Sequence, residues 1–181
     1  MKRAVSAIFN RTQTFAIIIG FTDGILNALT LASGHLIAGT KPTIGLSLRI
    51  AFGSAICGIF VFFTAEYARL RGELIHAESQ LNLASHGRFA TSQLGKQIRN
   101  DAFISALISS FANFLGSLFP LLLGYFMPNP PILAIVPAIL ALGLLGIALA
   151  HIVRGRSLTW LVGLVTAGIA LSAIGVWLHI A

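Results

Sequence analysis

Five stretches of the chain are apolar and nearly free of charged side chains. They cover about 14–38, 44–66, 102–127, 131–153 and 157–180. Each is longer than the roughly 20 apolar residues that a helix needs to cross about 30 Å of hydrocarbon. None alternates apolar and polar residues as a barrel strand does, so in lipid only helices satisfy their backbone hydrogen bonds. The pattern predicts an all-α polytopic membrane protein with five transmembrane helices in a single domain, 1–181.

The connection 67–101 is the one long polar stretch between these spans. It carries three acidic residues, Glu73, Glu78 and Asp101, and five basic ones. Its apolar residues recur at helical spacing, which is typical of an amphipathic helix. We therefore expect the second span to continue into the cytoplasm as an amphipathic helical extension.

Basic residues are distributed unevenly between the two sides of the predicted membrane. Of the twelve Lys and Arg residues, ten lie on the side of the N-terminus, and only Lys41 and Arg49 lie on the other. The positive-inside rule then places the N-terminus in the cytoplasm and the C-terminus outside. The net charge of +7 is explained by this topology, so we expect no nucleic-acid partner.

Composition narrows the classes of function. The chain is 56% hydrophobic and 9% charged, against roughly 25% charged residues in an ordinary soluble domain, which excludes a separate soluble catalytic domain. Cys57 is the only cysteine, so one chain cannot build a cysteine-based metal centre. No catalytic triad, P-loop or dinucleotide fingerprint is recognisable. We expect a protein that is not an enzyme and holds no cofactor.

Asp23 is the most informative residue, because it lies well inside the first span. A carboxylate in mid-membrane costs at least about 2.5–3.5 kcal/mol unless it is paired or hydrated. Asn27 and Thr30 follow at i+4 and i+7, which gives a polar stripe able to line a path for a cation. The alternative is structural: Asp23-Gly24 would break the helix and cap the next segment, and Gly20-x-x-x-Gly24 would be a packing seam.

Two further candidates lie on the second span and its extension. Glu66 is either a hard oxygen ligand for a cation that arrives from the cytoplasm, or the partner of Arg69 and Glu73 in a solvated electrostatic ladder. Glu73-x-x-His76 places a carboxylate and an imidazole on one helical face, a spacing used in metal-binding bundles. The alternative for Glu73 and His76 is a plain solvated helix face.

Four motifs follow one another along nearly the whole chain. They are GFTDGI at 20–25 with LASG at 31–34, AEYARLR at 65–71, LGSLFPL at 115–121, and GRS at 155–157. In this order and at this spacing they resemble the vacuolar iron transporter family, whose members move ferrous iron or manganese out of the cytosol.

The resemblance implies a homodimer with a translocation path near the subunit interface. It implies that Asp23 binds both metal and proton and that Glu66 is the acidic residue of the second span. The transported Fe²⁺ or Mn²⁺ would be cargo, exchanged for protons. Two departures from the plant members are visible: Phe62 replaces a methionine one turn before Glu66, and 67–101 is short and poor in glutamate.

Those departures motivate a rival hypothesis, a structural or partner-binding membrane protein that keeps the scaffold without transport. A carrier for an organic solute is a second alternative. For localisation we expect an integral membrane protein of a prokaryotic plasma membrane, because no organelle-targeting segment is visible. In a eukaryote the resemblance implies a vacuolar or other organelle membrane.

Overall fold

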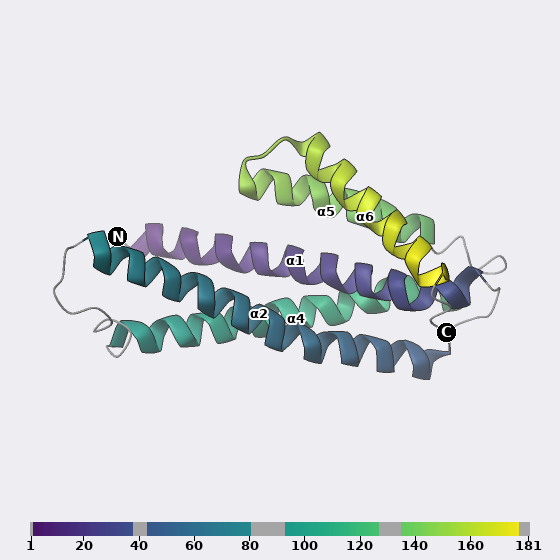
Figure 1. The fold of residues 1–181 in the computed structure, drawn as a ribbon, viewed down its shortest axis with the longest axis horizontal. Coiled ribbons are helices and arrows are strands. Elements are labelled where there is room, and N and C mark those ends of the chain that lie inside the picture. The colour runs from purple at the N-terminus through teal and green to yellow at the C-terminus, as the bar shows by residue number, and fades with distance from the viewer. Residues whose placement is uncertain (1, 38–42, 81–92, 127–134, 178–181) are drawn as a thin grey trace.

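A computed structural model describes residues 2–37, 43–80, 93–126 and 135–177 (Figure 1). In these residues the chain folds into α-helices and forms no strand. The helices are α1 (Lys2–Ile37), α2 (Ile44–Gln80), α4 (Gln93–Phe126), α5 (Ile135–Val153) and α6 (Ser157–Trp177). All five are long and apolar enough to cross a membrane. The prediction of an all-α protein with five spanning helices is confirmed.

Helices α1, α2 and α4 are longer than a bilayer requires. They contain 36, 37 and 34 residues, which at 1.5 Å per residue is about 51–56 Å against about 30 Å of hydrocarbon. Figure 1 shows the start of α1, the end of α2 and the start of α4 at the same end of the molecule. Helices α5 and α6, with 19 and 21 residues, match the hydrocarbon thickness.

The polar connection 67–101 is divided between two of these long helices. Residues 67–80 continue α2 without a break, and residues 93–101 form the first turns of α4. The remaining part of the expected helical extension, 81–92, lies outside the described residues.

Helices α1 and α4 approach each other closely through small residues. A side chain on Gly20 or Gly24 of α1 would meet the backbone of α4 at the carbonyls of Ser109 and Asn113. On α4, a Cβ at Gly116 would lie 2.6 Å from the Phe21 carbonyl oxygen. In lipid, helices associate through such close packing, because the lipid tails are as apolar as the helix surfaces and burial of these surfaces gains no hydrophobic free energy. The packing seam at Gly20-x-x-x-Gly24, which the sequence offered as the structural alternative, is therefore present.

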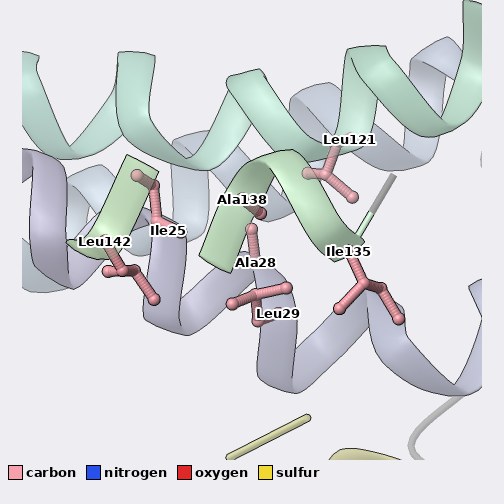
Figure 2. Packing of buried hydrophobic residues seen from close by; sticks show 7 residues of the cluster. All are labelled: Ile25, Ala28, Leu29, Leu121, Ile135, Ala138 and Leu142. Carbon is pink, nitrogen blue, oxygen red and sulfur yellow. The ribbon is translucent and has the colours of Figure 1, made fainter. Parts of the chain in front are cut away.

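Helices α5 and α6 form a hairpin that packs on α1 and on the far half of α4. Figure 2 shows the apolar cluster at this contact, where α1, α4 and α5 meet. Its members are Ile25, Ala28, Leu29, Leu121, Ile135, Ala138 and Leu142. The hairpin closes against α1 at Gly175 of α6, where a Cβ would run into the Thr30 carbonyl oxygen. This core fixes the part of α1 that carries Asp23.

Helix α1 runs unbroken past Asp23 and Gly24. The alternative in which Asp23-Gly24 ends one helix and caps the next is therefore wrong. Asp23 projects from a regular helix, so its carboxylate is not used to cap a helix end.

Candidate functional site

Asp23 lies near the middle of the apolar span Gln13–Leu31 of α1. Its Oδ2 accepts two hydrogen bonds from amides, over 2.6 Å from Asn113 Nδ2 and over 3.3 Å from Asn27 Nδ2. No described side chain donates to Oδ1. The carboxylate is thus stabilised by amide dipoles, with no basic residue among these partners.

A third helix completes the surroundings of Asp23 through Ser54 of α2. The Ser54 hydroxyl accepts a hydrogen bond from Asn27 Nδ2 over 2.9 Å and donates one to Asn113 Oδ1 over 2.6 Å. Asp23, Asn27, Ser54 and Asn113 therefore form a closed ring of hydrogen bonds that joins α1, α2 and α4. A polar ring at this depth is stable because each buried donor finds an acceptor.

Asn113 is the most enclosed member of this ring, with no exposed surface. Its amide fits against Gly58 of α2, where a Cβ would lie 2.9 Å from Nδ2. One turn further along α4, the Ser117 hydroxyl lies 3.3 Å from Asn113 Oδ1 and 3.1 Å from the Gly24 carbonyl oxygen. Gly58 and Ser117 hold the amide in a slot between α1 and α2.

The sequence located part of this site and missed the rest. Asn27 contacts Asp23 as the i+4 spacing predicts. Thr30 does not join them, because its hydroxyl bonds the Leu26 carbonyl of its own helix. Ser54 and Asn113 were not identified as site residues; the available signal was that Asn113 is an amide inside a span, as costly to bury as Asn27.

Ser109 lies one turn before Asn113 on α4 and has an unsatisfied hydroxyl. It has no exposed surface, and its Oγ finds no hydrogen-bond partner among the described residues. An unsatisfied buried hydroxyl costs about 1–3 kcal/mol. Ser105, one turn earlier again, lines a small cavity, so Ser105, Ser109 and Asn113 form a polar column along α4.

That cavity lies between α1, α2 and α4 and has a volume of about 40 Å³. Glu66 and Phe62 line it from α2, and Ala16 lines it from α1. One water needs about 10–15 Å³ on this measure, so the cavity has room for roughly three. Ile19 also lines the cavity and precedes Asp23 by four residues, so along α1 the cavity reaches to about one helical turn, or about 6 Å, from Asp23.

Glu66 belongs to the electrostatic ladder that was one of its two interpretations. Arg69 donates to both of its oxygens, from Nε over 2.9 Å and from a terminal nitrogen over 2.6 Å. The same guanidinium contacts Glu73 Oε1 over 2.5 Å. The Glu66 side chain is 20% exposed and that of Glu73 is 63% exposed, so the ladder runs from the cavity outward into solvent.

The five residues predicted as metal ligands thus fall into separate places. Asp23 and Asn27 share the ring, Glu66 and Glu73 share Arg69, and His76 is an exposed residue of α2 beyond Glu73. Within the described ranges, no three His, Cys, Asp or Glu side chains cluster as they would around a bound metal. Any cation at Asp23 must take its other ligands from amide and hydroxyl oxygens.

Fold and composition together define an integral membrane protein with five spanning helices and a polar ring in its interior. Comparison of the chain with protein-family models, with curated proteins and with solved structures finds no match.

Proposed function

We propose that this protein is a membrane transporter that exports a divalent transition metal, Fe²⁺ or Mn²⁺, from the cytosol in exchange for protons. The observation that carries the proposal is Asp23: an ionisable group inside a span, held by neutral amides. Ionisable residues in this setting are costly and mark ion pathways. The resemblance to the vacuolar iron transporter family supplies the metal and the direction.

The exchange follows from the chemistry of a single carboxylate. A proton and a divalent cation compete for the same oxygens, so binding of one releases the other. When Asp23 takes up its proton from outside and its cation from the cytoplasm, the two fluxes are coupled. This mechanism needs one titrating group at the site, and Asp23 is the only acidic member of the ring.

The cavity beside Glu66 serves as the inner mouth of the path in this proposal. Glu66, which lines it, lies on α2 just before Arg69 and Arg71, and the positive-inside rule assigns these basic residues to the cytoplasm. A cation that displaces Arg69 from Glu66 would pass along Ser105 and Ser109 to Asp23.

The side chains of the ring carry the oxygens that a small hard cation prefers. Carboxylate, amide carbonyl and hydroxyl oxygens suit Mn²⁺ and related ions, although both amides face Asp23 with Nδ2 in this structure. The cavity beside Glu66, of about 40 Å³, is far below the roughly 300–1,000 Å³ of sites for organic molecules. A hollow of about 450 Å³ between α1 and α4 is lined by apolar side chains and offers an organic solute no polar partner. A homodimer, as in the family, is part of the proposal.

Transport by purified protein in liposomes tests this function. Metal entry, followed with a quenched internal dye, should require wild-type protein and increase with an imposed pH gradient. Asp23→Asn keeps the size and polarity of the side chain and should abolish the flux. Thr166→Ala is the control, because Thr166 is exposed on α6 and bonds only carbonyls of its own helix.

Two results would contradict the proposal. If Asp23→Asn transported Mn²⁺ and Fe²⁺ at the wild-type rate with the same dependence on pH, Asp23 would have no part in coupling. If the wild-type protein moved neither metal, the structural or partner-binding alternative would stand instead.

A further inference from the structure

The ring around Asp23 has a direction. Asn27 Nδ2 donates to Ser54 Oγ, Ser54 Oγ donates to Asn113 Oδ1, and Asn113 Nδ2 donates to Asp23 Oδ2. Asn27 Nδ2 also faces Asp23 Oδ2. Both amides therefore present their NH₂ groups to the carboxylate. This direction stabilises a bare anion and repels a cation.

The same ring can run in the opposite direction without moving a backbone atom. An asparagine amide has nearly the same shape when it is turned by 180° about its Cβ–Cγ bond, which exchanges oxygen and nitrogen. A serine hydroxyl both donates and accepts. With both amides turned, Asn113 Nδ2 would donate to Ser54 Oγ, which is 2.6 Å from the present Oδ1, and Ser54 would donate to Asn27.

The slot of Asn113 offers partners for a turned amide at the cost of one weak contact, because Nδ2 now lies 3.5 Å from the Ser54 carbonyl oxygen, which a turned Oδ1 would face. Gly58 leaves room for a flat amide and no more, since a Cβ there would come within 2.9 Å of Nδ2. Ser117 Oγ, 3.3 Å from Oδ1, can accept from a turned amide while its proton goes to the Gly24 carbonyl oxygen. Because Asn113 is fully buried, its orientation depends on these partners and on what lies at Asp23.

In the reversed ring, oxygens would replace both amide nitrogens that now face Asp23. One would stand 2.6 Å and the other 3.3 Å from Asp23 Oδ2. Oxygen atoms so close to a carboxylate repel it unless a positive charge lies among them. The reversed ring is therefore stable only around a cation or a proton, whereas the present one needs Asp23 Oδ2 to act as an acceptor.

We propose that Asn113 and Asn27 turn together through Ser54, which converts a ring that stabilises the Asp23 carboxylate into an oxygen cage that coordinates a divalent cation. Asn113 supplies a cation ligand from α4, and Ser54 couples the two amides. This inference rests on the proposed function, since it names the ligands of the transported metal.

Binding of Mn²⁺ to the purified protein in nanodiscs tests the proposal without transport. Electron paramagnetic resonance measures the free ion directly. Asn113→Leu removes the ligand at similar volume and should weaken Mn²⁺ binding about tenfold or more. Asn113→Asp keeps an oxygen at the same position and should bind at least as tightly as the wild type. Ser110→Ala is the matched control: it deletes another α4 hydroxyl bonded to α2, at Ala55, outside the ring.

A spectroscopic signature separates ligation from support of the fold. Infrared difference spectra of protein with ¹³C-labelled asparagine side chains should show an amide carbonyl band that shifts when Mn²⁺ is added. The Asn113 part of this band should be missing in Asn113→Asp. In Ser54→Ala the two amides are uncoupled, so the shift should shrink while the Ser110→Ala spectrum matches that of the wild type.

The outcomes distinguish this inference from the function on which it rests. If Asp23→Asn loses Mn²⁺ binding while Asn113→Leu binds like the wild type, or if Mn²⁺ shifts no asparagine band, the turning ring is wrong and the proposed function stands. If the wild-type protein binds no Mn²⁺, both fail. Should Asn113→Leu not fold, Asn113→Asp and the wild-type spectra decide the question.

Discussion

At the scale of single residues, one face of α4 carries buried polar groups that are hydrogen-bonded and one that is not. Ser117 and Asn113 of α4 have no exposed surface and are hydrogen-bonded to α1 or α2. Ser109, equally buried, has no partner among the described residues. In hydrocarbon a lost or gained hydrogen bond between helices is worth about 0.6 kcal/mol on average and up to about 1.7 kcal/mol. Substitutions at these positions should therefore differ in sign.

Replacement of Ser109 by alanine should leave the free energy of unfolding unchanged or raise it by about 1 kcal/mol, because an unsatisfied hydroxyl is removed. Ser117→Ala, the matched control, should lower it by about 0.6–1.7 kcal/mol, because the bond to the Gly24 carbonyl is lost. Unfolding in mixed micelles measures both. A clear loss of stability in Ser109→Ala would mean that its hydroxyl has a partner in the membrane.

The ion pairs of Arg69 are far more exposed to solvent than these buried hydroxyls, since the Arg69 side chain is 49% exposed. Exposed ion pairs contribute about 0–1 kcal/mol and are screened by salt. Arg69→Ala should therefore lower the free energy of unfolding by less than about 1 kcal/mol, and the loss should shrink at high ionic strength. Arg71→Ala is the comparison two residues away. A larger loss that salt does not reduce would show that the ladder is a structural element.

At the scale of the helices, close contact between α1 and α4 determines where the polar residues meet. The contact is made by glycines facing backbone, at Gly24 against Asn113 and at Gly116 against Phe21. The same approach brings the Asn113 amide to Asp23, which lies 90 residues away in the chain. Formation of the site therefore depends on the packing of these small residues, and a substitution that separates α1 from α4 should also disturb the ring around Asp23.

Gly116→Ala tests this link. The added Cβ would lie 2.6 Å from the Phe21 carbonyl oxygen, which is backbone and cannot move aside alone, so α1 and α4 should separate at a cost of about 1–3 kcal/mol. Gly53→Ala is the control, since a Cβ at Gly53 meets nothing within 4 Å. Thermal unfolding should show a lower melting temperature for Gly116→Ala and an unchanged or raised one for Gly53→Ala. Equal melting temperatures would contradict the link.

At the scale of the whole molecule, helix length and charge agree on how the protein sits in the bilayer. Only the three helices of 34–37 residues exceed the membrane thickness, and they extend at the end where α1 starts, α2 ends and α4 starts (Figure 1). Arg69, Arg71, Lys96 and Arg99 belong to these extensions. We expect this end to face the cytoplasm.

Cysteine labelling tests that orientation. In a Cys57→Ser background, Arg156→Cys in the turn before α6 should react with an impermeant maleimide only from the cytoplasmic side. Thr43→Cys, immediately before α2, should react only from the other side, because α2 crosses the membrane between Thr43 and the extended end of the molecule. Arg156 and Thr43 are both exposed. The reverse pattern of labelling would overturn the positive-inside assignment for this chain.

The sequence by itself determined the five helices and the position of Asp23, because both depend on local quantities. A run of apolar residues must hydrogen-bond its own backbone in lipid, and a carboxylate within it is costly whatever surrounds it. The i+4 contact of Asn27 with Asp23 follows from helix geometry alone.

Tertiary structure alone decided which helices meet and in which rotation. Helices in lipid gain no hydrophobic energy by pairing, so the contact between α1 and α4 depends on the fit of glycines to backbone that is distant in the chain. For that reason the partners of Asp23 on α2 and α4, Ser54 and Asn113, were not predicted. The same packing placed Glu66 beside a small cavity between α1, α2 and α4.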